Sequence, residues 1–433
     1  MKRPGILYFF LFAVNLTVIF SCNEPKDEVW PEIIINQPDA NRFYSPGDTI
    51  TLEADFSDDA TLSFVKVALV DTYNHPVLAP VSISPAASQY HLGAELVIDD
   101  ASLKGGSYNL QFQASDGVNT TSKYVKVNID EIDRELLYPV VVTSEGTNHV
   151  RILRTDSTGV FRSIYMYQGD YAASDVSNAF GLLFFSGKTM ADLQAFSLAE
   201  NKSLWSVPCE QSSTGHWFEM LAYYYPWLLV SQYDGYVRGY DRYGVQQFKS
   251  QPVANNFAEQ VYMMQDYVIA GMKEYSTDNR QLAVFHVSGG KLLDLQPLDF
   301  LPVGFGKAGT NKVIVFGNEG SDGVIAIYDL NESTLPVINR LKGENISSVD
   351  MMSDNVFYLS AGNELYRYTY LINSAFPLAS GYENGKIVCE NLNEQLYVAS
   401  GNTLFLVNAQ DGSVDTSWQF NGEILDIHLL YNK

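Results

Sequence analysis

The stretch Asn393–Asn408 reads NEQLYVASGNTLFLVN, in which two apolar runs flank a short Ser-Gly-Asn turn. Leu, Tyr, Val and Phe favour β-strands, and Gly and Asn are the residues that a tight turn requires. The stretch therefore predicts a β-hairpin.

Similar units recur through the C-terminal 300 residues. Their second strands begin near residues 138, 181, 227, 267, 312, 355 and 395. A period of about 43 residues, with four strands in each unit, is typical of β-propeller blades. Seven such starts predict a seven-bladed propeller over residues 132–433.

The two ends of this array complement each other. The first unit begins at Tyr138 without a preceding propeller strand, whereas residues 423–431 form an apolar segment beyond the last unit. We expect residues 423–431 to pair beside Tyr138–Thr143, so that the C-terminal strand completes the first blade and leaves no open sheet edge.

Residues 31–131 alternate between apolar and polar side chains, with turn signals between the runs. Such spacing in about 100 residues, without the Cys and Trp of antibody domains, predicts an immunoglobulin-like β-sandwich. The whole chain is thus expected to be all-β. The expected strands of the sandwich are Glu32–Asn36, Thr49–Phe56, Phe64–Val70, Tyr90–Ile98, Ser107–Ala114 and Lys123–Ile129.

Composition limits the partners. The 433 residues carry 50 Asp and Glu against 27 Lys and Arg, for a net charge of −23, and 13% are aromatic. Nucleic acid is excluded as a partner because phosphate binding needs clustered basic residues. The three cysteines form no disulfide framework, and we expect Cys209 and Cys389 to be small buried apolar residues.

The N-terminus predicts a secreted, lipid-anchored protein. Basic residues and an apolar run over residues 1–21 are typical of a signal peptide. Val18-Ile19-Phe20-Ser21-Cys22 resembles a bacterial lipobox, although Phe20 is larger than the usual residue. The resemblance implies that Cys22 is lipidated and that residues 22–30 form a tether to the membrane.

Further motifs resemble known families. Lys26-Asp27-Glu28 is similar to the surface-export signal of Bacteroidota lipoproteins, which implies the outer face of the outer membrane. Ser45-Pro46-Gly47-Asp48 and Ala114-Ser115-Asp116-Gly117 resemble PKD-like domains. Leu193–Trp205 and Leu404–Trp418 resemble quinoprotein blades, which are related to WD40 blades. Together the motifs resemble Bacteroidota PKD-like surface lipoproteins with a C-terminal propeller.

Candidate binding residues lie in the loops that surround the mouth of a propeller channel. Aromatic rings stack on sugar C–H faces, while carboxylates and amides bind hydroxyls. The alternative is that these aromatic side chains pack between blades. The candidates are Tyr171, His216, Trp217, Glu219, Tyr233, Asp234 and Tyr236.

Metal and catalytic signals are sparse. Asp58, Asp59 and Asp116 are candidate calcium ligands, because calcium prefers carboxylate oxygens, but Asp is also an ordinary turn residue. We expect no other cofactor and assign no catalytic residue, because no nucleophile elbow, zinc-protease motif or phosphate loop occurs.

Three functions remain open. The first is a non-catalytic binding or scaffold component on the cell surface, whose partner is a glycan or an outer-membrane protein of a nutrient-uptake system. The second is a periplasm-facing scaffold for outer-membrane assembly. The third is a glycan-cleaving propeller enzyme, since two carboxylates across a channel mouth could act together.

Overall fold

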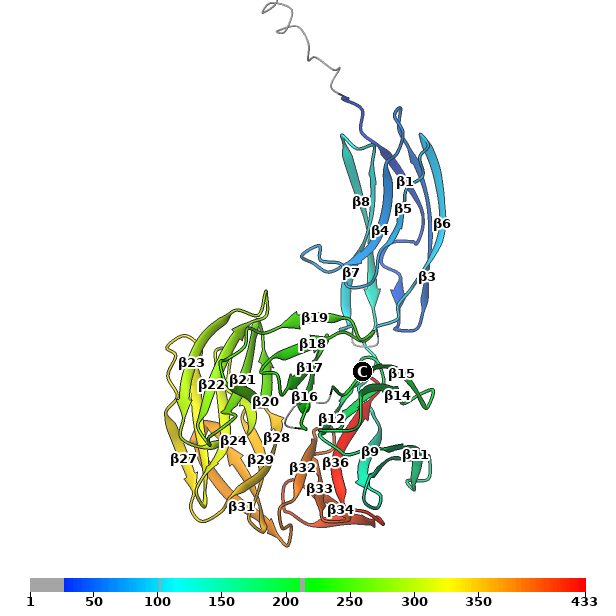
Figure 1. The fold of residues 1–433 in the computed structure, drawn as a ribbon. Coiled ribbons are helices and arrows are strands. Elements are labelled where there is room, and N and C mark those ends of the chain that lie inside the picture. Colours follow the sequence, from blue (N-terminus) through cyan, green and yellow to red (C-terminus); the bar gives the residue numbers. More distant parts are fainter. Residues whose placement is uncertain (1–26, 101–102, 211–214) are drawn as a thin grey trace, which may run out of the picture. The chain divides into compact units, whose positions relative to one another are not determined.

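A computed structural model describes residues 27–100, 103–210 and 215–433. The chain divides into two compact units, the first ending at Asp133 and the second running from Arg134 to Lys433 (Figure 1). The predicted signal peptide, the lipidation site at Cys22 and residues 22–26 of the tether lie outside the described residues.

The first unit contains two β-sheets around one core. β1 (Glu32–Gln37), β3 (Thr49–Ser57) and β6 (Gln89–Val97) form one sheet in that order. The other sheet has the order β2 (Phe43–Tyr44), β8 (Thr120–Ile129), β7 (Gly106–Ser115), β4 (Phe64–Val70) and β5 (Val81–Ile83). Every expected strand is present. β2 and β5 were not expected, because two or three residues are too few to show alternation.

Alternation along β3 explains how this core forms. Ile50, Leu52, Ala54 and Phe56 point inward and are buried, while the intervening side chains are exposed. They pack with Leu110 and Phe112 of the opposite sheet in a single apolar cluster. A period of two places all the apolar side chains of a strand on one face, so these residues drive the two sheets together.

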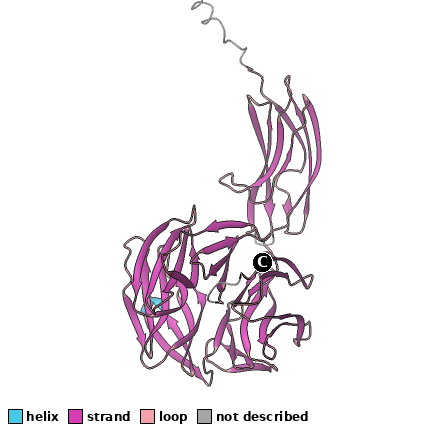
Figure 2. Ribbon diagram, in the orientation of Figure 1, coloured by secondary structure: helices cyan, strands magenta, loops and turns pink. Residues whose placement is uncertain are grey.

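The second unit contains seven four-stranded antiparallel sheets among its described residues (Figures 1 and 2). We number these blades in the order of their second strands along the chain. The strands of each blade are given from the innermost to the outermost. The first blade is β36 (Ile424–Tyr431), β9 (Leu136–Ser144), β10 (His149–Thr155) and β11 (Phe161–Gln168). The second is β12 (Ala173–Ser177), β13 (Leu182–Ser186), β14 (Leu193–Ser197) and β15 (Lys202–Val207). The third is β16 (Phe218–Tyr224), β17 (Trp227–Gln232), β18 (Val237–Tyr240) and β19 (Gln246–Lys249).

The remaining blades follow the same order. The fourth is β20 (Asn256–Met264), β21 (Tyr267–Glu274), β22 (Arg280–His286) and β23 (Leu292–Leu298). The fifth is β24 (Leu301–Lys307), β25 (Lys312–Glu319), β26 (Asp322–Asp329) and β27 (Val337–Leu341). The sixth is β28 (Ile346–Ser353), β29 (Val356–Ala361), β30 (Glu364–Thr369) and β31 (Ser374–Ser380), with the short helical turn η1 (Tyr370–Ile372) before β31. The seventh is β32 (Lys386–Glu390), β33 (Gln395–Ser400), β34 (Thr403–Asn408) and β35 (Val414–Gln419).

The innermost strands close into a ring. Each of β36, β12, β16, β20, β24, β28 and β32 contacts the innermost strand of the next blade, and β32 contacts β36. The sheets are therefore blades of a β-propeller, arranged around a common centre in Figure 1. The seven repeat starts predicted from the sequence fall at the second strands β9, β13, β17, β21, β25, β29 and β33.

The C-terminal strand closes the ring as expected. β36 pairs antiparallel with β9, with Leu430 opposite Tyr138 and Ile424 opposite Thr143. The first and the last strands of the unit thus lie in the same blade. This pairing removes the sheet edge that an open array of blades would expose. No helix among the described residues is long and apolar enough to cross a membrane.

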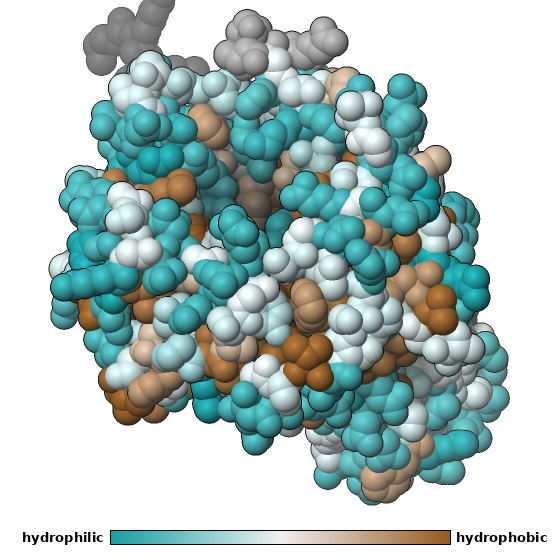
Figure 3. Space-filling model, turned by 90° about the horizontal axis from the view of Figure 1, so that it is seen from below, coloured by the Kyte–Doolittle hydropathy of each residue, from teal (hydrophilic) through white to brown (hydrophobic). Residues whose placement is uncertain are grey.

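Buried strands and a mostly hydrophilic surface characterise the second unit. The second strands are buried along most of their length; every residue of Leu182–Ser186 is buried, for example. On the side of the molecule seen in Figure 3, apolar side chains occur in small groups among hydrophilic ones. Each apolar cluster of the second unit joins two neighbouring blades, so the core of this unit lies between its blades.

Candidate functional site

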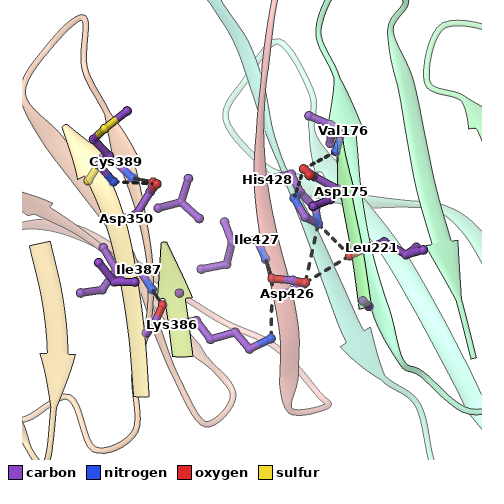
Figure 4. A pocket seen from close by; sticks show the side chains of 18 of the residues that line it. Asp175, Val176, Leu221, Asp350, Lys386, Ile387, Cys389, Asp426, Ile427 and His428 are labelled. Carbon is purple, nitrogen blue, oxygen red and sulfur yellow. Dashed lines mark hydrogen bonds and ion pairs between the residues drawn. The ribbon is translucent and has the colours of Figure 1, made fainter. Parts of the chain in front are cut away.

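The innermost strands of the propeller line a central channel. Its cavity has a volume of about 640 Å³ and is bounded by side chains from all seven innermost strands. Titratable groups in its wall include Asp175, Asp350, Lys386, Asp426 and His428 (Figure 4). No motif or spacing in the sequence groups these five residues, which come from four blades.

Asp426 and His428 on β36 bind the second and seventh blades. The Asp426 carboxylate accepts a hydrogen bond of 2.6 Å from the Tyr171 hydroxyl and lies 3.6 Å from Lys386 Nζ. Ser174 Oγ lies 2.7 Å from His428 Nε2, and it lies 3.3 Å from Asp426 Oδ2. We call Tyr171, Ser174, Lys386, Asp426 and His428 the closure network, because it ties the closing strand to both neighbouring blades.

The pKa of Asp426 reflects these contacts. Burial alone would raise the pKa of this carboxyl, but Lys386, His428 and the Tyr171 hydroxyl together hold it below its usual value. Lys386 Nζ also donates to the carbonyl oxygen of Leu425. The closing strand therefore carries an ionised carboxylate near neutral pH, and its partners balance that charge.

Two further carboxylates connect neighbouring innermost strands. Asp175 accepts hydrogen bonds from its neighbour Val176 N (2.7 Å) and from Tyr223 N (2.6 Å) on β16. Asp350 repeats the arrangement with Met351 N (2.8 Å) and with Cys389 N (2.7 Å) on β32. Each carboxylate thus bridges two blades through backbone N–H groups, which is a structural use of the side chain.

Burial raises the pKa of both bridging carboxyls. For Asp350 burial is the largest cause, hydrogen bonds from the backbone oppose it, the charge of Asp175 adds to it, and the pKa rises to about 6. Burial also raises the pKa of Asp175, and the charge of His428 partly opposes that rise. His428 Nδ1 lies 3.9 Å from Asp175 Oδ1.

Most of the predicted binding residues lie on the face where loops connect consecutive blades. Because strands in a blade are antiparallel, these loops share a face with the turns between second and third strands. This blade-connecting face includes residues 169–172, 233–236, 250–255 and 275–279.

His216, Glu219 and Tyr233 form one group on this face. His216 Nδ1 lies 3.1 Å from Glu219 Oε1, and its ring lies 5.8 Å from the ring of Tyr233. The Tyr233 ring also contacts those of Phe257 and Tyr275, with 4.8 Å between centroids in each case. Tyr275 completes this aromatic group, and its hydroxyl donates to the Tyr233 carbonyl oxygen.

Asp234 and Tyr236 have other partners. The Asp234 carboxylate forms a two-point ion pair with Arg238, at 2.9 and 2.5 Å. The Tyr236 ring lies near two cations, 3.8 Å from Lys249 Nζ and 5.1 Å from the Arg238 guanidinium carbon. Cations already face this ring, so it is a poor platform for a neutral ligand.

Trp217 and Tyr171 are largely structural. Trp217 packs against the apolar cluster between the second and third blades, and its Nε1 is buried without a partner. Tyr171 belongs to the closure network and not to the His216 group. For these two residues, the structure matches the alternative of packing between blades.

The predicted calcium ligands serve turns of the first unit. Asp58 Oδ1 accepts from Asp59 N at 2.7 Å, and Asp116 Oδ1 accepts from Val118 N and Asn119 N. Asp58 Oδ2 is buried and has no partner. No cluster of three or more His, Cys, Asp or Glu in the described part of the chain could hold a metal ion.

Both downstream cysteines are unpaired thiols. Cys389 is buried as expected, whereas Cys209 is only half-buried. Burial, followed by the charge of Asp350, raises the pKa of the Cys389 thiol well above its usual value. A thiol in such surroundings is unreactive.

No family profile matches the sequence, and no curated protein matches it. Among solved structures, Sqt1 of Saccharomyces cerevisiae is similar at 13% identity, covering 67% of this chain and 85% of its own, with a TM-score of 0.49. The WD40 β-propeller domain of Doa1 is similar at 13% identity, covering 61% and 86%, with a TM-score of 0.47. A quinonprotein alcohol dehydrogenase-like protein from Bacteroides thetaiotaomicron is similar at 12% identity, covering 93% and 99%, with a TM-score of 0.46. These likenesses concern the fold alone.

Proposed function

We propose that the chain is a lipoprotein displayed on the outer face of a bacterial outer membrane, where its propeller binds a neutral glycan without cleaving it. The lipobox-like segment ending at Cys22 and the export-signal-like Lys26-Asp27-Glu28 support the location. The two-sheet first unit is then an immunoglobulin-like or PKD-like spacer between the lipid anchor and the propeller.

The aromatic group around Tyr233 is the observation that carries this proposal. Tyr275 is 39% exposed, and the side chain of His216 is 47% exposed. The Glu219 carboxylate pairs with His216, lies 3.7 Å from Lys188 Nζ and is only 10% exposed. Exposed aromatic side chains suit a neutral sugar, because their rings contact its C–H groups.

The role of the channel carboxylates supports binding over cleavage. A glycosidase needs two carboxyl groups free to act on substrate from opposite sides. In the channel, Asp175 and Asp350 each accept two backbone N–H bonds, and Asp426 is held by Tyr171 and Lys386. Freeing any of them would break contacts between blades.

Glycan-array binding of the purified chain tests the proposal, with Tyr275→Ala compared against Tyr243→Ala. Tyr243 is also exposed, at 67%, but lies in the turn between β18 and β19 on the opposite face. We expect Tyr275→Ala to weaken binding at least about 10-fold, as loss of a stacking ring costs about 1.4 kcal/mol, and Tyr243→Ala to leave it unchanged.

Product analysis of the bound glycan separates binding from cleavage. Intact sugar is expected after prolonged incubation. Shortened products would contradict non-catalytic binding, and equal binding by both variants would move the site away from the Tyr233 group.

A further inference from the structure

Two tryptophans of outermost strands occupy different places in their blades. In β15, Trp205 pairs with Ala195 immediately before the β-bulge. In β35 the corresponding residue is Thr416, opposite Leu406, and Trp418 pairs with Leu404 two residues further along the strand. Two residues of a strand span about 7 Å. The two tryptophans, which look equivalent in the sequence, are therefore not equivalent in the ring.

Trp205 fills the space between the second and third blades. Its Nε1 donates a 2.9 Å hydrogen bond to the carbonyl oxygen of Arg242, in the turn Asp241–Val245. A Cβ at Gly244 of this turn would lie 2.8 Å from Trp205 Cδ2. The indole thus packs directly on the turn.

The same turn recurs in the first blade but receives no indole. Asp156–Val160 repeats the Asp-x-x-Gly-Val pattern, and Asp156 Oδ1 accepts from Thr158 N and Val160 N as Asp241 Oδ1 does from Tyr243 N and Val245 N. A Cβ at Gly159 would meet no atom within 4 Å. Trp418 lies too far along β35 to occupy this place.

A groove is left between the seventh and first blades. It has a volume of about 480 Å³ and is lined by the rings of Phe161, Trp418 and Phe420, by Leu153 and Val160, and by polar residues. Phe161 contacts both other rings edge-on, at 5.5 Å from Trp418 and 5.1 Å from Phe420. A groove of this size is within the range of about 300–1,000 Å³ that small-molecule sites occupy.

Unused hydrogen-bonding groups surround these rings. Trp418 Nε1 has no hydrogen bond to a described residue, and it is not among the buried polar atoms that lack a partner, as Trp217 Nε1 is. Gln419 and Asn421, which line the groove, are exposed. Arg151 forms a 2.9 Å ion pair with Glu145, but its Nε is buried without a partner.

We propose that this groove is a second binding site, for a neutral saccharide. The aromatic wall suits sugar C–H faces, and the amides and the indole N–H suit hydroxyl groups. The paired Arg151 and Glu145 add no net charge, so an ionic ligand gains nothing here. This inference takes its ligand class from the proposed function but assigns a site that is separate from the Tyr233 group.

Fluorine NMR of the full chain labelled with 5-fluorotryptophan tests the proposal. The five tryptophans give resonances that single Trp→Phe variants assign. The probes are maltose, cellobiose, lactose and β-1,4-mannobiose. We expect at least one of them to shift the Trp418 resonance and leave Trp205 unmoved. Trp418→Phe is expected to weaken that binding at least about 5-fold, since an indole donor bond contributes about 1 kcal/mol, and Trp205→Phe to leave it unchanged.

The outcomes separate this inference from the proposed function. If Trp217, which adjoins the Tyr233 group, shifts while Trp418 does not, the groove is excluded and glycan binding on the blade-connecting face stands. If Trp418 alone shifts, the groove is the site and the Tyr233 group is excluded for that sugar. If no probe moves the Trp418 resonance, the groove proposal is wrong.

Discussion

Asp350 shows how one side chain can couple the stability of the ring to pH. Its two carboxylate oxygens accept from Met351 N and from Cys389 N, which joins the sixth blade to the seventh. Burial raises its pKa to about 6, well above the usual range of an aspartate. The unfolded chain therefore ionises at lower pH than the folded chain, and the contribution of this group to stability falls as pH rises through 6.

Asp350→Asn is expected to remove this pH dependence. Relative to the unmodified chain, the free energy of unfolding of the variant should rise by about 1.4 kcal/mol between pH 5 and pH 7.5, the equivalent of one pKa unit. Urea titrations of both proteins across this range measure the difference. The variant also loses one hydrogen-bond acceptor, and this loss lowers its stability by the same amount at every pH. A stability difference between the two proteins that does not change with pH would therefore contradict a raised pKa of Asp350.

At the scale of elements, the turn before β36 sets how closely the last strand approaches the first blade. Glu423 N donates to Ser144 Oγ at 3.0 Å, and Ser144 N donates to the Glu423 carbonyl oxygen at 2.9 Å. A Cβ at Gly422 would lie 1.7 Å from the Ser144 carbonyl oxygen. Only glycine allows this approach, because that neighbour is backbone and cannot move aside.

Gly422→Ala is therefore expected to destabilise the propeller by about 1–3 kcal/mol, the usual cost of forcing an extra atom into a packed site. Gly401→Asn is the matched control. Gly401 lies in a neighbouring turn with a φ of +57°, where Asn is tolerated and no atom lies within 4 Å. Thermal unfolding compares the two variants, and equal midpoints would show that the turn does not limit closure.

At the scale of the whole molecule, the location depends on the N-terminus. Acyl chains on Cys22 would bind the membrane with about 0.8 kcal/mol for each buried CH₂ group. A chain held in this way needs only modest affinity for a glycan confined to the same surface. Its net charge of −23 favours solubility of the displayed part over association.

Cys22→Ser is expected to move the chain from the membrane fraction to the soluble fraction, whereas Cys209→Ser should leave it in the membrane. Immunoblots of fractionated cells measure this distribution. Protease added to intact cells should degrade the unmodified chain. Survival of the chain under that treatment would favour the periplasm-facing scaffold instead.

The sequence determined the parts of this protein that depend on local pattern. Alternation along Thr49–Phe56 fixed the inward face of a sandwich strand, and recurring hairpins such as Asn393–Asn408 predicted the number of blades. The unpaired segment 423–431 also predicted closure, because a surplus strand at one end matched a vacancy at the other.

Only the tertiary structure decided which side chains meet across blades. Tyr171 and Asp426 are 255 residues apart in the chain yet share a hydrogen bond, and Asp350 reaches Cys389 on another strand. A shift of two residues relative to the bulge that both outer strands share places Trp205 on a turn and Trp418 beside a groove. Periodicity specifies the face to which a side chain points, but the register and packing of neighbouring blades specify what it touches.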